Sequence, residues 1–96
     1  MDKDEKFWNG VFDLLIGECG AFDDGYERDN FARQQMEEDY PAEWRFCGSL
    51  GFGGKFWRNG GRMYVTCYRE DETPERMSAI ERANRRLEEM VAEQKG

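Results

Sequence analysis

The segment that most resembles a chemical site is the glycine-rich stretch GSLGFGGKFWRNGG, residues 48–61. A lysine after a glycine pair can hold a phosphate in the pattern GxxxxGK[ST], whose backbone N–H groups surround the phosphate. With Gly54-Lys55 in that pattern, positions 49 and 56 must be Gly and Ser or Thr, but they are Ser49 and Phe56. Phe56 also occupies the third glycine position of the dinucleotide pattern GxGxxG. We therefore expect these glycines to serve the turns and a bulge of a small sheet and not to bind a nucleotide.

The other residue types that carry chemistry do not form a recognisable site. The chain has no histidine, so a Ser or Cys nucleophile lacks its usual base. Its three cysteines, Cys19, Cys47 and Cys67, lack CxxC spacing, which argues against a disulfide framework or a zinc site and predicts buried thiols. The acids lack the spacing of an EF-hand calcium loop. We expect no enzyme activity, no cofactor and no metal site.

Charge is distributed unevenly along the chain, whose net charge is −7. Residues 1–43 hold thirteen acids and four bases, and residues 70–96 hold eight acids and five bases. Residues 44–69 between them hold five bases and no acid. The overall charge disfavours nonspecific binding to DNA or to anionic membranes, whereas the middle of the chain has the opposite sign.

No segment has the features of a membrane span or an export signal. The apolar runs are no longer than Leu14-Leu15-Ile16, and the acidic start MDKDEK lacks a basic n-region and an apolar h-region. We expect a cytoplasmic protein, located in the host cytoplasm if a phage encodes it.

Periodicity predicts the elements that position these residues. Apolar residues at helical spacing predict a helix over about 4–17 and a surface helix over about 25–39, in which Ala32, Met36 and Tyr40 share a face. Alternation, rings and glycines predict strands at about 43–50, 54–58 and 62–69. Thr73 as N-cap and Pro74 at the first position begin a helix over about 74–93. The expected fold is a single α+β domain, 1–96, with two N-terminal helices, a three-stranded antiparallel meander and a C-terminal helix, the helices packed mainly on one sheet face.

The hairpin between the last two strands predicts two different sheet faces. With Asn59-Gly60 as its two-residue turn, Phe56 lies opposite Met63 and Trp57 opposite Arg62. One face then carries Phe56, Met63, Val65 and Cys67, and the other carries Lys55, Trp57, Arg62, Tyr64, Thr66 and Tyr68. The first set has the composition of a core, and the second that of a partly solvated face.

The first hypothesis for function is a small inhibitory binding protein. Its carboxylates would mimic nucleic-acid phosphates and enter the basic channel of a nucleic-acid-processing enzyme or complex. In size, charge and lack of enzyme motifs, the chain resembles the inhibitors that phages use against host nucleases, among them anti-CRISPR and anti-restriction proteins. This resemblance is one of size and charge alone. The proposed acidic contact residues are Asp23, Asp24, Glu27, Asp29, Glu37, Glu38 and Asp39.

The alternative is a binding module that uses the basic aromatic sheet face. Rings with nearby cations can stack unpaired bases and hold phosphates, as in proteins that bind single strands. Exposed Trp, Tyr and Arg also dominate protein–protein interfaces, so the same face can contact a partner protein or a second copy of this chain in a homodimer. The candidate residues are Arg45, Lys55, Trp57, Arg58, Arg62, Tyr64 and Tyr68.

Overall fold

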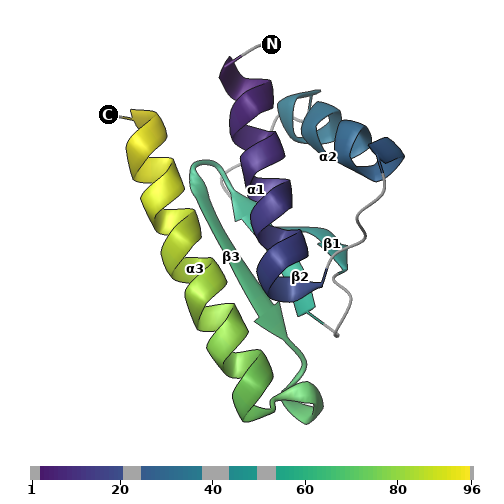
Figure 1. Cartoon of the computed structure of the whole chain (residues 1–96), viewed down its shortest axis with the longest axis vertical. Helices are drawn as coiled ribbons and strands as arrows, with labels where there is room; N and C mark the ends of the chain where they lie inside the picture. The colour runs from purple at the N-terminus through teal and green to yellow at the C-terminus, as the bar shows by residue number, and fades with distance from the viewer. Residues whose placement is uncertain (1–2, 21–24, 38–43, 50–53, 96) are drawn as a thin grey trace.

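The computed structural model of the chain describes residues 3–20, 25–37, 44–49 and 54–95, with the backbone alone described at 3, 25–29, 45–47, 49 and 95. Its class is α+β, as the sequence predicts (Figure 1). The elements in chain order are α1 (Lys3–Cys19), α2 (Gly25–Glu37), β1 (Arg45–Ser49), β2 (Gly54–Asn59), β3 (Arg62–Cys67), the 3-10 turn η1 (Arg69–Asp71) and α3 (Pro74–Lys95).

The described bounds differ from the predicted ones by a few residues. Helix α1 continues to Cys19, because Gly20 adopts a φ of 68° and donates its N–H to the carbonyl of Ile16 at 3.2 Å. This is the left-handed glycine that commonly ends a helix. Strand β3 ends at Cys67 and not at the predicted Arg69, because Arg69–Asp71 form a 3-10 turn. Predicted helix residues 38–39 and strand residues 43 and 50 lie outside the described part of the chain.

The sheet has the strand order β1-β2-β3 with antiparallel pairing. The predicted hairpin register is wrong by two residues: Asn59 pairs with Arg62, and Phe56 lies opposite Val65 instead of Met63. The turn is therefore Gly60-Gly61, with a φ of 58° at Gly60 alone, as in a type II′ turn. Because the shift is even, the two predicted sets of side chains still lie on opposite faces.

Strand β1 carries a bulge. Phe46 pairs with Trp57, but Gly48 pairs with Phe56, so one extra residue of β1 lies between two consecutive partners on β2. A bulge at this place agrees with the expectation that Gly48 suits irregular pairing.

Helices α1 and α3 are antiparallel neighbours. Near one end, Gln94 Nε2 donates to Asp4 Oδ1 at 3.3 Å, and near the other, Arg82 Nε donates to Glu18 Oε2 at 2.9 Å. Gly10 lies at their contact, where a Cβ would meet Cε of Met90 at 3.2 Å. A glycine within α1 therefore allows close approach of α3.

Helix α3 begins as the sequence predicts. Thr73 Oγ1 accepts a hydrogen bond from the backbone N–H of Arg76 at 3.2 Å, and Pro74 is the first helical residue. The cap satisfies one of the N–H groups that a helix start leaves without an internal partner.

Helix α2 buries a different stripe from the predicted one. Ala32 and Gln35 are buried, whereas Met36, expected to share a face with Ala32, is 41% exposed. The physical reason is Phe31, whose ring centroid lies 5.3 Å from that of Phe12 and 5.8 Å from that of Phe56. Packing of this large ring rotates α2 so that Gln35, four residues on, faces inward.

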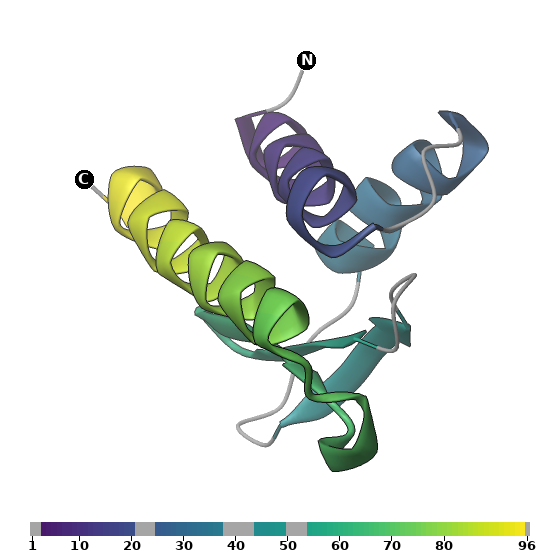
Figure 2. The same cartoon turned by 60° about the horizontal axis from the view of Figure 1, so that its bottom comes forward.

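One core joins the helices to the sheet. All three helices lie on the same side of the sheet (Figure 2). The core contains residues of every described layer: Trp8, Val11, Leu15 and Cys19 of α1, Ala32 of α2, Phe56 of β2, Met63 and Val65 of β3, and Ile80, Ala83 and Leu87 of α3. Burial of Phe56, Met63 and Val65 matches the predicted core face, with Cys67 half-buried at its end.

Candidate functional site: the outer face of the sheet

The sheet face that points away from the helices carries rings and cations. We call it the outer face and define it by seven residues of β1, β2, β3 and their ends: Trp44, Lys55, Trp57, Arg62, Tyr64, Thr66 and Tyr68. Five of them, Lys55, Trp57, Arg62, Tyr64 and Tyr68, are among the residues that the sequence predicts for binding. The strands position them because every second residue of a strand projects to the same side.

A cross-strand pair forms the centre of the outer face. Trp57 lies directly opposite Tyr64, and the indole Nε1 of Trp57 donates to Thr66 Oγ1 at 2.7 Å. This hydrogen bond satisfies the polar atom of the indole and holds the ring across the neighbouring strand. The hydrogen bond therefore restrains the orientation of the ring on this face.

Lys55 and Tyr68 form one end of the outer face. The ammonium of Lys55 donates to the hydroxyl of Tyr68 and lies 3.8 Å from the centre of its ring. Tyr68 is 50% exposed. The cation therefore adds charge to an accessible ring and also restrains it.

Trp44 and Arg62 form the other end. The ring of Trp44 lies edge-on to that of Tyr64, with centroids 4.9 Å apart, and the Arg62 guanidinium is 5.7 Å from the Trp44 ring. Trp44 is 39% exposed. Because Trp44 precedes β1 and its ring contacts Tyr64 on β3, the aromatic surface extends across the sheet.

Arg58, which the sequence groups with the binding residues near this face, does not lie on the outer face itself. It lies opposite Met63 on the helix side of the sheet, and its guanidinium lies 4.4 Å from the Trp8 ring. Its Nη1 donates to the backbone carbonyl of Gln35 at 2.8 Å and to Gln35 Oε1 at 3.1 Å. Successive residues of a strand project to opposite faces, so position 58 faces inward when Lys55 and Trp57 face outward. The two-residue shift of the hairpin does not change this.

Arg58 caps a helix end. The carbonyl of Gln35 belongs to the last turn of α2, where carbonyls have no internal partner, and that turn contains no basic residue of its own. A guanidinium from β2 therefore supplies the positive charge that a helix C-terminus favours. Arg45, the other predicted cation, pairs with Arg58 in the β1–β2 register, and only its backbone is described.

The predicted acidic surface is described only in part. Asp23, Asp24, Glu38 and Asp39 lie outside the described residues, and Glu27 and Asp29 lie in α2 with only their backbone described. Glu37 is exposed at the end of α2. These seven acids are therefore grouped only by their positions in the sequence.

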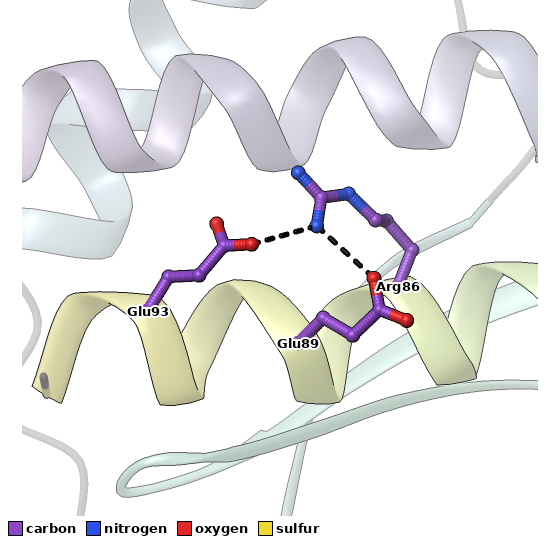
Figure 3. Close-up of polar contacts among 3 residues, drawn as sticks. All are labelled: Arg86, Glu89 and Glu93. Atoms are coloured by element: carbon purple, nitrogen blue, oxygen red, sulfur yellow. Dashed lines mark hydrogen bonds and ion pairs between the residues drawn. The ribbon is translucent and has the colours of Figure 1, made fainter.

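Arginines of α3 engage several acids of the helical layer. Arg86 Nη1 contacts Glu89 Oε2 and Glu93 Oε1, each at 3.1 Å (Figure 3). The hydrogen bonds that the Arg86 guanidinium donates to Glu93 and to Glu89 raise its pKa. Elsewhere, Arg82 contacts Glu18 and Arg76 contacts Asp71. These contacts reduce the local negative potential around the paired carboxylates.

The described cysteines have the properties of packed thiols. Cys19 is fully buried in α1, and desolvation followed by the charge of Glu18 raises its pKa to about 11. Desolvation, Glu72 and Asp71 raise the pKa of the half-buried Cys67, against a lowering by Arg76. A raised pKa keeps a thiol protonated and slow to react. Cys47 has only its backbone described.

Two other structural findings concern sites expected to be absent. Across the described side chains, no group of three or more His, Cys, Asp or Glu is arranged to hold a metal ion. None of the described helices combines the length and apolar character needed to cross a bilayer.

Comparisons with protein-family models, with curated proteins and with solved structures found no match for this chain. We therefore infer its function from its own surfaces.

Sequence reasoning missed three residues with specific contacts. Trp44 completes the outer face, on which the sequence had already placed Thr66, and Gln35 and Asn84 bind groups of the sheet. The only available signal was a polar residue in a buried helical stripe, since Asn84 lies on the apolar side of α3 and must have a partner there.

Proposed function

We propose that this chain is a small, non-enzymatic binding protein that contacts a partner protein through the outer face. The observation that carries the proposal is the packed set of rings and cations on the sheet. Three contacts hold this set: the hydrogen bond between Trp57 and Thr66, the hydrogen bond between Lys55 and Tyr68, and the ring contact between Trp44 and Tyr64. Rigid aromatic side chains lose little entropy on binding, and Trp, Tyr and Arg supply most of the energy of protein interfaces.

A protein partner fits this face better than nucleic acid. The outer face carries only two cations, Lys55 and Arg62, and the chain as a whole carries a net charge of −7. Affinity for nucleic acid comes largely from many phosphate contacts, which two cations on an acidic protein do not provide. A second copy of the chain is one possible protein partner.

Substitutions at exposed positions test the proposal. We expect Tyr68→Ser and Arg62→Glu to reduce partner binding by at least about tenfold, as loss of interface anchors does. Arg85→Glu, the same charge reversal on exposed α3, is the matched control and should retain binding. The measurement is affinity capture from a lysate, followed by calorimetric titration of the recombinant partner. Equal binding by all three variants would contradict the proposal.

Two further measurements identify the kind of partner. Light scattering of the purified chain measures whether it is a homodimer. If the outer face forms the dimer interface, Tyr68→Ser should dissociate the dimer. Titration of tryptophan fluorescence with single-stranded oligonucleotides at low salt should give no response. A saturable response that Arg62→Glu removes would replace the protein partner with nucleic acid.

The second candidate is inhibition of a nucleic-acid-processing enzyme by acidic mimicry. It is supported by the exposed carboxylate of Glu37 at the end of α2 and by the excess of acids in residues 1–43. Such an inhibitor competes with DNA or RNA and loses affinity as salt rises. Charge reversal of Glu37, Glu38 and Asp39 together should abolish the competition. Tight binding that is indifferent to this reversal would exclude mimicry through that segment.

A further inference from the structure

A groove runs along the outer edge of β3, beside the outer face. Trp44 and Tyr64 line one side, and Leu87, Val91 and Ala92 of α3 line the other. Its volume is about 610 Å³, within the roughly 300–1,000 Å³ of typical ligand sites. The groove therefore has room for a large apolar side chain and part of the chain that bears it.

The backbone of β3 faces this groove at Met63. Val65 N–H donates to Asn84 Oδ1 at 2.7 Å, and Val65 C=O accepts from Asn84 Nδ2 at 3.1 Å, so both peptide groups of Val65 point away from β2. In an antiparallel pair this orientation recurs at every second residue. Met63, which also lines the groove, therefore presents its N–H and C=O to the same edge.

The edge of β3 has hydrogen-bond partners at Val65 but differs at Met63. Asn84 satisfies the edge at Val65, and no hydrogen bond from another described side chain or loop reaches Met63. A donor and an acceptor on one strand residue match the groups of a second peptide backbone, as in strand addition to a sheet edge.

Charge on the groove selects the sequence of the occupant. Arg62 and Glu88 both line it and are exposed, and neither forms an ion pair with another described residue. Arg62 favours an acidic residue of a ligand and Glu88 favours a basic one. Glu88 also repels the phosphates of a nucleic acid.

We propose that this groove binds a short extended peptide segment of the partner protein, paired through its backbone with Met63 and anchored by one large apolar side chain between Trp44 and Val91. An acidic and a basic residue flank the anchor in that segment. The inference rests on the proposed function, because Trp44, Arg62 and Tyr64 belong to both the groove and the outer face.

The test uses acetylated, amidated hexapeptides in which a central leucine lies between an aspartate and a lysine, in both orders, with threonine elsewhere. We expect saturable NMR shifts of the Met63 amide and of the Trp44 indole, with a dissociation constant in roughly the millimolar range. N-methylation of the leucine, which removes a backbone donor, should weaken binding about tenfold, and so should leucine to alanine in the peptide.

Protein variants provide matched controls. Ala92→Glu adds bulk and charge at an exposed helical position of the groove, so it should remove peptide binding while the fold, checked by circular dichroism, persists. Arg85→Glu should bind the peptides as the wild-type chain does. Absence of peptide binding at about 10 mM, or equal binding of the N-methylated peptide, would overturn the inference. The same shifts caused by an oligonucleotide or by self-association of the chain would also overturn it.

The two proposals fail in different ways. If Tyr68→Ser reduces capture of the partner while Ala92→Glu leaves it unchanged and no peptide binds, the groove inference is wrong and the outer-face proposal stands. If neither Tyr68→Ser nor Arg62→Glu reduces capture, the outer-face proposal is wrong.

Discussion

The side-chain amide of Asn84 takes the place of a neighbouring strand beside Val65. Its Oδ1 accepts from the Val65 N–H at 2.7 Å, and its Nδ2 donates to the Val65 C=O at 3.1 Å. One side chain of α3 thus makes both bonds that a fourth strand would make with this residue. It joins the helix to the sheet and blocks strand addition at the centre of β3.

Replacement of Asn84 by leucine should destabilise the chain. The change keeps the approximate volume but leaves the N–H and C=O of buried Val65 without partners, at about 1–3 kcal/mol for each. We expect the free energy of unfolding in urea to fall by roughly 2–6 kcal/mol. Asn84→Asp can still accept from Val65 N–H, so its free energy of unfolding should lie between those of the wild-type chain and Asn84→Leu. Unchanged hydrogen exchange of the Val65 amide in Asn84→Leu would contradict this account.

Loss of the guanidinium at Arg58 should loosen α2. Arg58→Met keeps the side-chain stem near Trp8 but removes both hydrogen bonds to Gln35. Charged hydrogen bonds contribute about 1.5–3 kcal/mol, so thermal unfolding should report a loss of that order. Exposed Arg85→Met should change stability by less than about 0.5 kcal/mol. Equal effects of the two substitutions would show that Arg58 does not cap the helix.

Alanine at two glycines should act in opposite directions. At both Gly17 and Gly60 an added Cβ would meet nothing within 4 Å, so sterics with neighbours do not distinguish them. Gly17 lies within α1, where alanine gains up to about 1 kcal/mol, whereas Gly60 has a φ of 58°, which costs a non-glycine residue about 1–2 kcal/mol. The melting temperature should rise by a few degrees in Gly17→Ala and fall in Gly60→Ala. A fall in both would refute the assignment of Gly17 to an unstrained helical position.

The buried thiol of Cys19 should make stability depend on alkaline pH. Its pKa rises from 9.0 to about 11 in the folded chain, so between these values the folded state holds a proton that the unfolded state has lost. Stability from this group is therefore complete below pH 9 and decreases as the pH rises toward 11, by on the order of 2–3 kcal/mol.

The check for Cys19 is urea unfolding at several pH values between 8 and about 11. Cys19→Ala should be less stable at pH 8, because it leaves a small cavity, but should lose less stability as the pH rises. Tyrosines and lysines titrate in both proteins, so the difference between the two slopes isolates the thiol. Parallel slopes would rule out the raised pKa.

Local patterns predicted the class of fold because they depend on near neighbours. The start of α3 follows from Thr73 and Pro74, whose effects on a helix end operate within four residues. The two sheet faces follow from strand alternation, which survives the error of two residues in the hairpin. The turn itself was mispredicted because Asn59-Gly60 and Gly60-Gly61 both suit a two-residue loop, and cross-strand packing of Phe56 on Val65 selects between them.

Partners between distant segments did not follow from such patterns. Arg58 was grouped with the outer cations, although its partner Gln35 lies 23 positions away on α2. The predicted stripe of α2 included Met36, but the ring of Phe31 decided which side of that helix faces inward. Neither contact has a local signal, because each depends on how two elements meet in space.

By itself, the sequence determined the α+β class, the separation of sheet side chains into two faces and the unequal distribution of charge along the chain. Each of these depends on residue type and on fixed periods of 2.0 and about 3.6 residues. Only the tertiary structure decided that Asn84 closes the edge at Val65, that Arg58 faces α2 and that Trp44 reaches Tyr64. Those contacts exist because buried polar groups and large rings take whichever partners the packed layers bring within reach.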